Sequence, residues 1–152
     1  MVMFMLFAGS HFIAQGSGKV TLSADIESIE PVHGIQVTIL DMNTKEIIQR
    51  TEINSRLYCI LALENRYMIY FKKTGLPSAR IAVDTRNADA ADHNMHVKIN
   101  LSEESILAEG SISQSAGELT FNSVSGLFTL QSGVPGVGEL DYYNKVTSTP
   151  SF

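Results

Sequence analysis

The sequence is poor in features that several classes of protein depend on. Its single cysteine, Cys59, cannot form a disulfide within the chain. Basic residues number 11 against 16 acidic ones, a net charge of -5, so we expect no nucleic-acid partner because no basic face is available for phosphates. No uninterrupted apolar run reaches the roughly 20 residues of a membrane-spanning helix, so we expect no transmembrane span.

The first 15 residues, "MVMFMLFAGSHFIAQ", are largely apolar and end in small and polar residues. This pattern predicts a secretory signal peptide over residues 1–15, cleaved before Gly16, and therefore export to the periplasm, the outer envelope or the extracellular space. The leader lacks its usual positive charge, since no Lys or Arg precedes Lys19. The alternative is an apolar N-terminal strand or helix that packs on the domain.

From Lys19 onward, apolar residues recur at every second position, which is the period of a strand with one buried face. The first series is Val20, Leu22, Ala24 and Ile26. Turn-forming residues separate it from further strands predicted over about 35–40, 46–53, 57–63, 67–71, 81–83 and 95–101.

The stretch "LYCILALENRYMIYFKK" carries two of these strands. We interpret it as a β-hairpin that turns at Glu64 and Asn65. Cys59 lies within the alternating apolar series, where a thiol behaves as a small hydrophobic side chain, so we expect it to be buried.

These strands predict an all-β fold, namely a seven-stranded antiparallel immunoglobulin-like sandwich with an additional C-terminal β-hairpin. We expect antiparallel sheets because no long amphipathic helix is available for parallel crossovers. The sandwich spans residues 16–102, and residues 103–131 form a loop and the accessory hairpin. Residues 132–152 are rich in Gly, Pro, Ser and Thr, which predicts a flexible tail or an arm that docks weakly.

Three segments, "EPVHGIQVTILD", "QRTEINSRLYCILAL" and "NRYMIYFKKTGLPSARIAVDT", follow one another between about Lys19 and Thr85, and "MHVKINLSE" would close the domain. In this order the chain resembles the carboxypeptidase regulatory-like, or transthyretin-like, β-sandwich domains of bacterial envelope and secreted proteins. Ser55 stands where that family has a turn glycine, and Leu76 stands where it has an aromatic residue. The resemblance implies an accessory module without catalytic residues, and some related sandwiches bind carbohydrate.

The sequence offers no convincing catalytic or metal-binding set. His93 and His96 lie near Asp89 and Asp92, but positions three apart in a strand face opposite ways, so we interpret His93 as part of a solvated loop and His96 as an outward strand residue. No serine occupies a Gly-x-Ser-x-Gly elbow. We therefore expect no enzyme activity, no cofactor and no metal.

Tyr58 and Tyr70 are the candidate binding residues, because both fall on the face opposite the apolar series from Leu57 to Phe71. Exposed aromatic side chains stack on sugars or fill protein interfaces. The alternative is that the hairpin at residues 118–131 covers both tyrosines. Our leading functional hypothesis is a non-catalytic exported module that mediates protein contacts in the bacterial cell envelope. The second is a carbohydrate-binding module that uses these tyrosines or the loops at one end of the sandwich.

Overall fold

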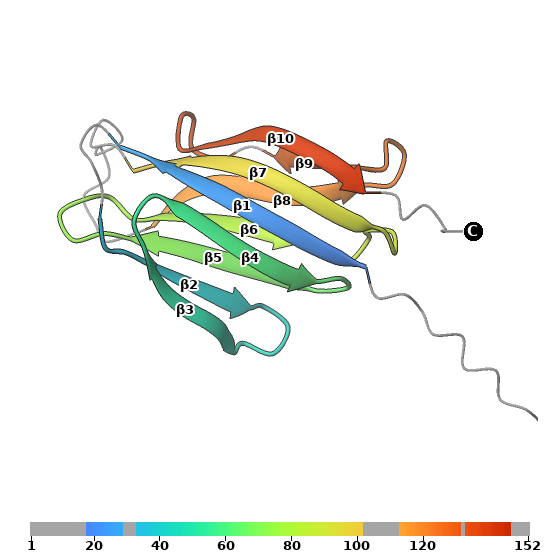
Figure 1. Cartoon of the computed structure of the whole chain (residues 1–152), viewed down its shortest axis with the longest axis horizontal. Helices are drawn as coiled ribbons and strands as arrows, with labels where there is room; N and C mark the ends of the chain where they lie inside the picture. The colour runs from blue at the N-terminus through green and yellow to red at the C-terminus, as the bar shows by residue number, and fades with distance from the viewer. Residues whose placement is uncertain (1–17, 29–32, 102–112, 132, 147–152) are drawn as a thin grey trace, which may run out of the picture.

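The computed structural model describes residues 18–28, 33–101, 113–131 and 133–146. They form two stacked β-sheets (Figure 1). The predicted signal peptide, residues 1–15, lies outside the described residues. The ten strands in the described part of the chain are β1 (Lys19–Glu27), β2 (Ile35–Asp41), β3 (Ile47–Ile53), β4 (Arg56–Ala62), β5 (Arg66–Lys72), β6 (Ala79–Asp84), β7 (Asp92–Asn100), β8 (Gln114–Asn122), β9 (Leu127–Gln131) and β10 (Gly138–Val146).

Sheet A has the strand order β10-β7-β1-β4, and sheet B has the order β3-β2-β5-β6-β8-β9. The β-sandwich predicted from the sequence is confirmed, but seven antiparallel strands were expected, and both sheets are mixed. Strand β1 pairs with β7 in parallel, and β6 pairs with β8 in parallel. The error has a physical reason: parallel neighbours need a crossover, but in a sandwich the intervening chain can cross through the opposite sheet instead of through a helix.

The predicted alternation of buried and exposed residues is confirmed along the strands of the core. Strands β1, β4, β5 and β7 each bury alternate side chains. The two inner faces meet in one apolar cluster whose largest fully buried members include Leu22, Leu57, Ile69, Phe71 and Met95. Removal of this apolar surface from water, which contributes about 25 cal/mol per Å² buried, is the main force that holds the sheets together.

The predicted hairpin of β4 and β5 is wrong, because these strands belong to different sheets. β4 pairs with β1, whereas β5 pairs with β2 and β6. The chain crosses between layers at Leu63–Asn65, and Glu64 has a positive φ of 59°. Thr85, which is fully buried, holds this crossing: its hydroxyl lies 2.9 Å from the carbonyl oxygens of both Ala62 and Asn65.

The C-terminal hairpin is confirmed as β8 and β9, but it does not cover an outer face. It extends sheet B beside β6. The expected flexible tail, 132–152, contains strand β10 over residues 138–146, which pairs with β7. Gly138, the first residue of β10, permits close packing: a Cβ atom added there would lie 2.4 Å from the carbonyl oxygen of Ala116.

Candidate functional site

The two predicted binding residues, Tyr58 and Tyr70, lie on opposite sides of the molecule. Tyr58 projects from the outer face of β4 in sheet A and is 64% exposed. Tyr70 projects from the outer face of β5 in sheet B, where its backbone neighbours are Thr38 and Arg80, and it is half-buried. Because the hydrophobic core separates them, the two tyrosines cannot form one binding platform.

The outer face of sheet A combines exposed apolar groups with hydrogen-bonding groups. Across this sheet, Tyr58 is paired with Ser23, and Ser23 with His96. The adjacent row places Ile60 beside Thr21. Tyr58 and Ile60 lie two positions apart on the same face of the edge strand, and Ile60 is 56% exposed. Together these residues form the candidate site, which we call the sheet A face.

A chain of hydrogen bonds runs across the sheet A face. The Ser23 hydroxyl lies 2.8 Å from Nδ1 of His96, and Nε2 of His96 lies 3.1 Å from an Asp25 carboxylate oxygen. When Nε2 of His96 carries the proton and donates a hydrogen bond to the carboxylate, Nδ1 accepts a hydrogen bond from the serine. The arrangement joins three residue types found in serine hydrolases, although here the serine faces Nδ1 rather than Nε2.

Arg56 completes this cluster from the edge strand. Its guanidinium makes two contacts to the Asp25 carboxylate, one of them 3.0 Å from Nη2 to Oδ2. These hydrogen bonds, with a smaller contribution from His96, lower the pKa of Asp25, and Asp25 in turn raises the pKa of Arg56. Asp25 is therefore ionised at neutral pH, and its carboxylate holds the Arg56 guanidinium and the His96 ring in place.

Sequence reasoning did not predict this cluster. Asp25, Ser23 and His96 share a face because β1 and β7 are parallel neighbours, and that pairing joins residues 73 positions apart. His96 was predicted to face outward, and the structure agrees. The prediction for His93 is wrong: it is fully buried within β7 instead of lying in a solvated loop. The alternation of Met95, Val97 and Ile99, extended one step back, would have placed His93 on the buried face.

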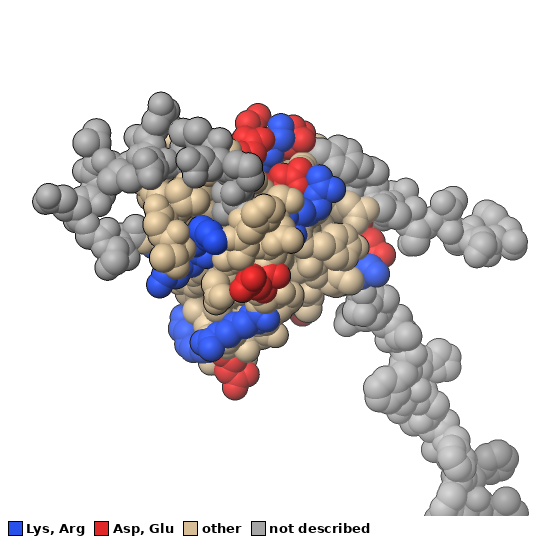
Figure 2. Space-filling view, turned by 60° about the vertical axis from the view of Figure 1, so that its left-hand side comes forward, with Lys and Arg blue, Asp and Glu red and all other residues tan. Residues whose placement is uncertain are grey.

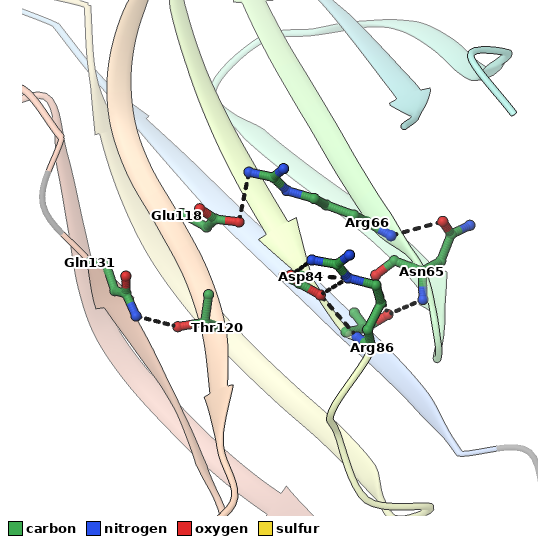
Figure 3. A network of polar contacts seen from close by, with 8 residues as sticks. Asn65, Arg66, Asp84, Arg86, Glu118, Thr120 and Gln131 are labelled. Carbon is green, nitrogen blue, oxygen red and sulfur yellow. Dashed lines mark hydrogen bonds and ion pairs between the residues drawn. The ribbon is translucent and has the colours of Figure 1, made fainter. Parts of the chain in front are cut away.

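The outer face of sheet B carries a different network (Figure 3). Arg66 pairs with Glu118 at 2.9 Å, which links β5 to β8 across β6. Arg86 binds the Asp84 carboxylate, and this contact lowers the pKa of Asp84. Both arginines are held in ion pairs within this network, although the buried Nε of Arg66 has no hydrogen-bond partner among the described residues.

One end of sheet A carries a half-open cavity of about 280 Å³. Its lining is Glu27, Lys98, Asn100 and residues 136–139. Lys98 also pairs with Asp141 at 3.1 Å, and this contact raises the pKa of Lys98. Within the described ranges, no three His, Cys, Asp or Glu side chains are placed to hold a metal ion.

The surface charge is mixed. On the side of the molecule seen in Figure 2, basic side chains lie among acidic and uncharged ones. In the part of the chain that the structure describes, there is no helix long and apolar enough to cross a membrane.

Comparison with known proteins assigns the chain to no family. No family model matches the sequence, and no curated protein matches it. One similar solved structure is described as "Crystal Structure of S.CueP", with 14% sequence identity and a TM-score of 0.36, and the match covers 55% of this chain and 60% of that one. The class that the described residues define is a two-layer β-sandwich with mixed sheets.

Proposed function

We propose that this chain is a non-catalytic, exported module that contacts another protein of the bacterial cell envelope through the sheet A face. The observation that carries the proposal is the exposure of Tyr58 and Ile60 side by side on strand β4. Large apolar and aromatic side chains that are this exposed mark interaction sites when polar groups surround them. The apolar residues 1–15 and the resemblance to carboxypeptidase regulatory-like domains support export and an accessory role.

The chemistry of the Ser23 cluster supports binding in preference to acyl transfer. Hydrolysis at Ser23 would need N–H donors aimed at a developing oxyanion. Strands β1 and β7 are both interior strands of sheet A, so their backbone N–H groups are directed at neighbouring strands. The surface around Ser23 is the outer face of the sheet, where the exposed Arg56 guanidinium and the partly exposed Ser23 hydroxyl and His96 imidazole are suited to hydrogen bonding with a bound partner.

Site-specific photocrosslinking tests the proposal. A photoreactive amino acid at position 58 should crosslink to an envelope protein in living cells, and the adduct should disappear when Ile60→Glu places a charge beside the probe on strand β4. The matched control carries the same probe at position 70, on the opposite sheet, and should give no such adduct. Equal adducts from both positions would contradict the proposal. N-terminal sequencing of the exported protein tests the predicted cleavage before Gly16.

A second candidate function, carbohydrate binding, is favoured by one specific observation. Tyr58 lies beside Ser23, and the His96 imidazole and the Asp25 carboxylate follow within one hydrogen-bonded chain. A ring that can stack on a sugar, next to donors and acceptors, suits a glycan. Glycan-array binding that Tyr58→Ala abolishes and Tyr70→Ala leaves unchanged would favour this function over protein contact.

A further inference from the structure

Strand β3 forms one edge of sheet B, and its side chains are less buried than those of its neighbours β2 and β5. One side of β3 pairs with β2, and its other side has no strand neighbour in the described structure. In Figure 1, β2 and β3 extend beyond β4, so β3 is the outermost strand on this side of the sandwich. Ile47 and Ile48 at its start are both exposed. An edge of this kind offers backbone groups for pairing with another strand.

The hydrogen-bond pattern identifies which residues of β3 offer those groups. The amide of Met42, just after β2, donates a hydrogen bond to the carbonyl of Arg66 in β5. Along an interior strand of antiparallel neighbours, successive residues direct their backbone groups to opposite sides. Even-numbered residues of β2 therefore bond to β5, and odd-numbered residues bond to β3. Val37 is paired with Thr51, so the odd-numbered residues of this part of β3 bond to β2. The free N–H and C=O groups therefore belong to Arg50 and Glu52.

We propose that β3 pairs in antiparallel fashion with β3 of a second copy of this chain, about a two-fold axis at Thr51. In this register Arg50 of each copy lies opposite Glu52 of the other copy, so the two-fold axis produces two such pairs. Each pair exchanges two backbone hydrogen bonds. The two edge residues that must pair through their backbones are thus of opposite charge. This inference concerns sheet B and does not depend on the proposed function of the sheet A face.

Charge selects this register over its neighbours. In the two nearest registers that still bring the free backbone groups of the two strands together, Arg50 would lie opposite Arg50 of the second copy, or Glu52 would lie opposite Glu52 of the second copy. Like charges directly opposite each other destabilise a strand pair. Within the described residues Arg50 makes no ion pair, and Glu52 has only a long contact of 3.4 Å from the Gln36 amide. Both charges are therefore available to the second copy.

Disulfide trapping tests the register. Thr51 would lie opposite Thr51 of the second copy in a non-hydrogen-bonded pair, with the two Cα atoms about 4.5 Å apart. This separation is within the range for a disulfide. Thr51→Cys should form a covalent dimer under mild oxidation. Gln49→Cys is the matched control, because Gln49 would face Ile53 of the second copy and lie far from its own counterpart. The buried Cys59 of the unmodified chain should form no dimer.

Charge reversal tests the pairing itself. In the Thr51→Cys chain, Arg50→Glu or Glu52→Arg alone should slow disulfide formation by about tenfold, because each creates two like-charge pairs, and the double reversal should restore the rate. Circular dichroism and thermal melting of each variant establish that it is folded. Equal trapping at positions 49 and 51, or a double reversal that fails to restore the rate, would overturn the proposal. So would a chain that stays monomeric and untrapped, as expected if β3 binds a different protein.

Discussion

The imidazole of His93, which is completely buried, lies with Nε2 2.9 Å from the Asp89 carboxylate. Its ring packs edge-on against Phe121 at 5.3 Å and Phe128 at 5.4 Å between centroids. His93 comes from sheet A and the phenylalanines come from β8 and β9 of sheet B. This contact therefore fastens the C-terminal hairpin to the opposite layer.

We predict that His93→Ala lowers the free energy of unfolding by about 3 kcal/mol, since it removes a large buried side chain and leaves a cavity between aromatic rings. Urea unfolding followed by circular dichroism measures the change. His93→Phe is the control: it restores the volume and should recover most of the loss. A change below about 0.5 kcal/mol in the alanine variant, as for a surface site, would show that this contact does not hold the layers.

Thr85 tests whether the crossing between β4 and β5 depends on one hydroxyl. Thr85→Val preserves the shape but removes the group that contacts the carbonyls of Ala62 and Asn65 and accepts from the Asn65 amide. The buried backbone groups lose a partner, so we predict a loss of about 1–3 kcal/mol in unfolding free energy. Thr85→Ser keeps the hydroxyl and should lose less. The prediction fails if valine is tolerated as well as serine in thermal unfolding.

Cys59 should be inert in the native protein. Burial raises the pKa of its thiol to about 12, so almost no thiolate is present at pH 8. We predict negligible reaction with a disulfide reagent under native conditions and rapid reaction in 8 M urea, where the pKa returns to about 8.5. Rapid labelling of the folded chain, with circular dichroism unchanged, would contradict the buried position of Cys59.

Asp41 should make stability depend on pH in the acid range. Its carboxylate accepts hydrogen bonds from the Thr44 amide at 3.0 Å, the Asn65 side chain at 2.6 Å and the Asn43 amide at 2.8 Å, and these lower its pKa. A folded pKa below the unfolded value means that the stabilisation is complete above about pH 4 and is lost as the pH falls through the folded pKa.

We therefore predict that Asp41→Ala is less stable than the unmodified chain at pH 7, and that the difference shrinks steadily below about pH 4. Unfolding measured in urea at a series of pH values gives both curves. Glu46→Ala, which removes an exposed carboxylate, serves as a control for the general effect of acid. A difference between Asp41→Ala and the unmodified chain that stays constant down to pH 2 would contradict this role of the carboxylate.

The positions of strands and their buried faces could be predicted because they depend on local alternation. Leu57, Cys59 and Leu61 are buried as the two-residue period requires. The partner of each strand could not be predicted in this way, because the same alternation fits a hairpin and a crossing between layers. A hairpin at residues 64–65 would place Tyr58 and Tyr70 on one face, whereas the crossing places them on opposite sides of the core.

Strand β10 shows a second limit. Composition alone predicted a flexible tail, since glycine and proline are unfavourable in a sheet. Gly138 is required at that point by the close approach of Ala116, which is a contact between distant parts of the chain. A glycine that permits such packing and a glycine in a mobile segment look the same in the sequence.

The sequence by itself determined which side of each core strand faces inward, that Cys59 is enclosed, and that the fold is a β-sandwich, because the alternation of apolar and polar side chains is a property of neighbouring residues. Only the tertiary structure decided that β1 lies parallel to β7, that Ser23, Asp25 and His96 meet, and that the two candidate tyrosines face opposite ways. Those relationships depend on the layer to which each strand is assigned, and that choice is made by packing between residues far apart in the chain.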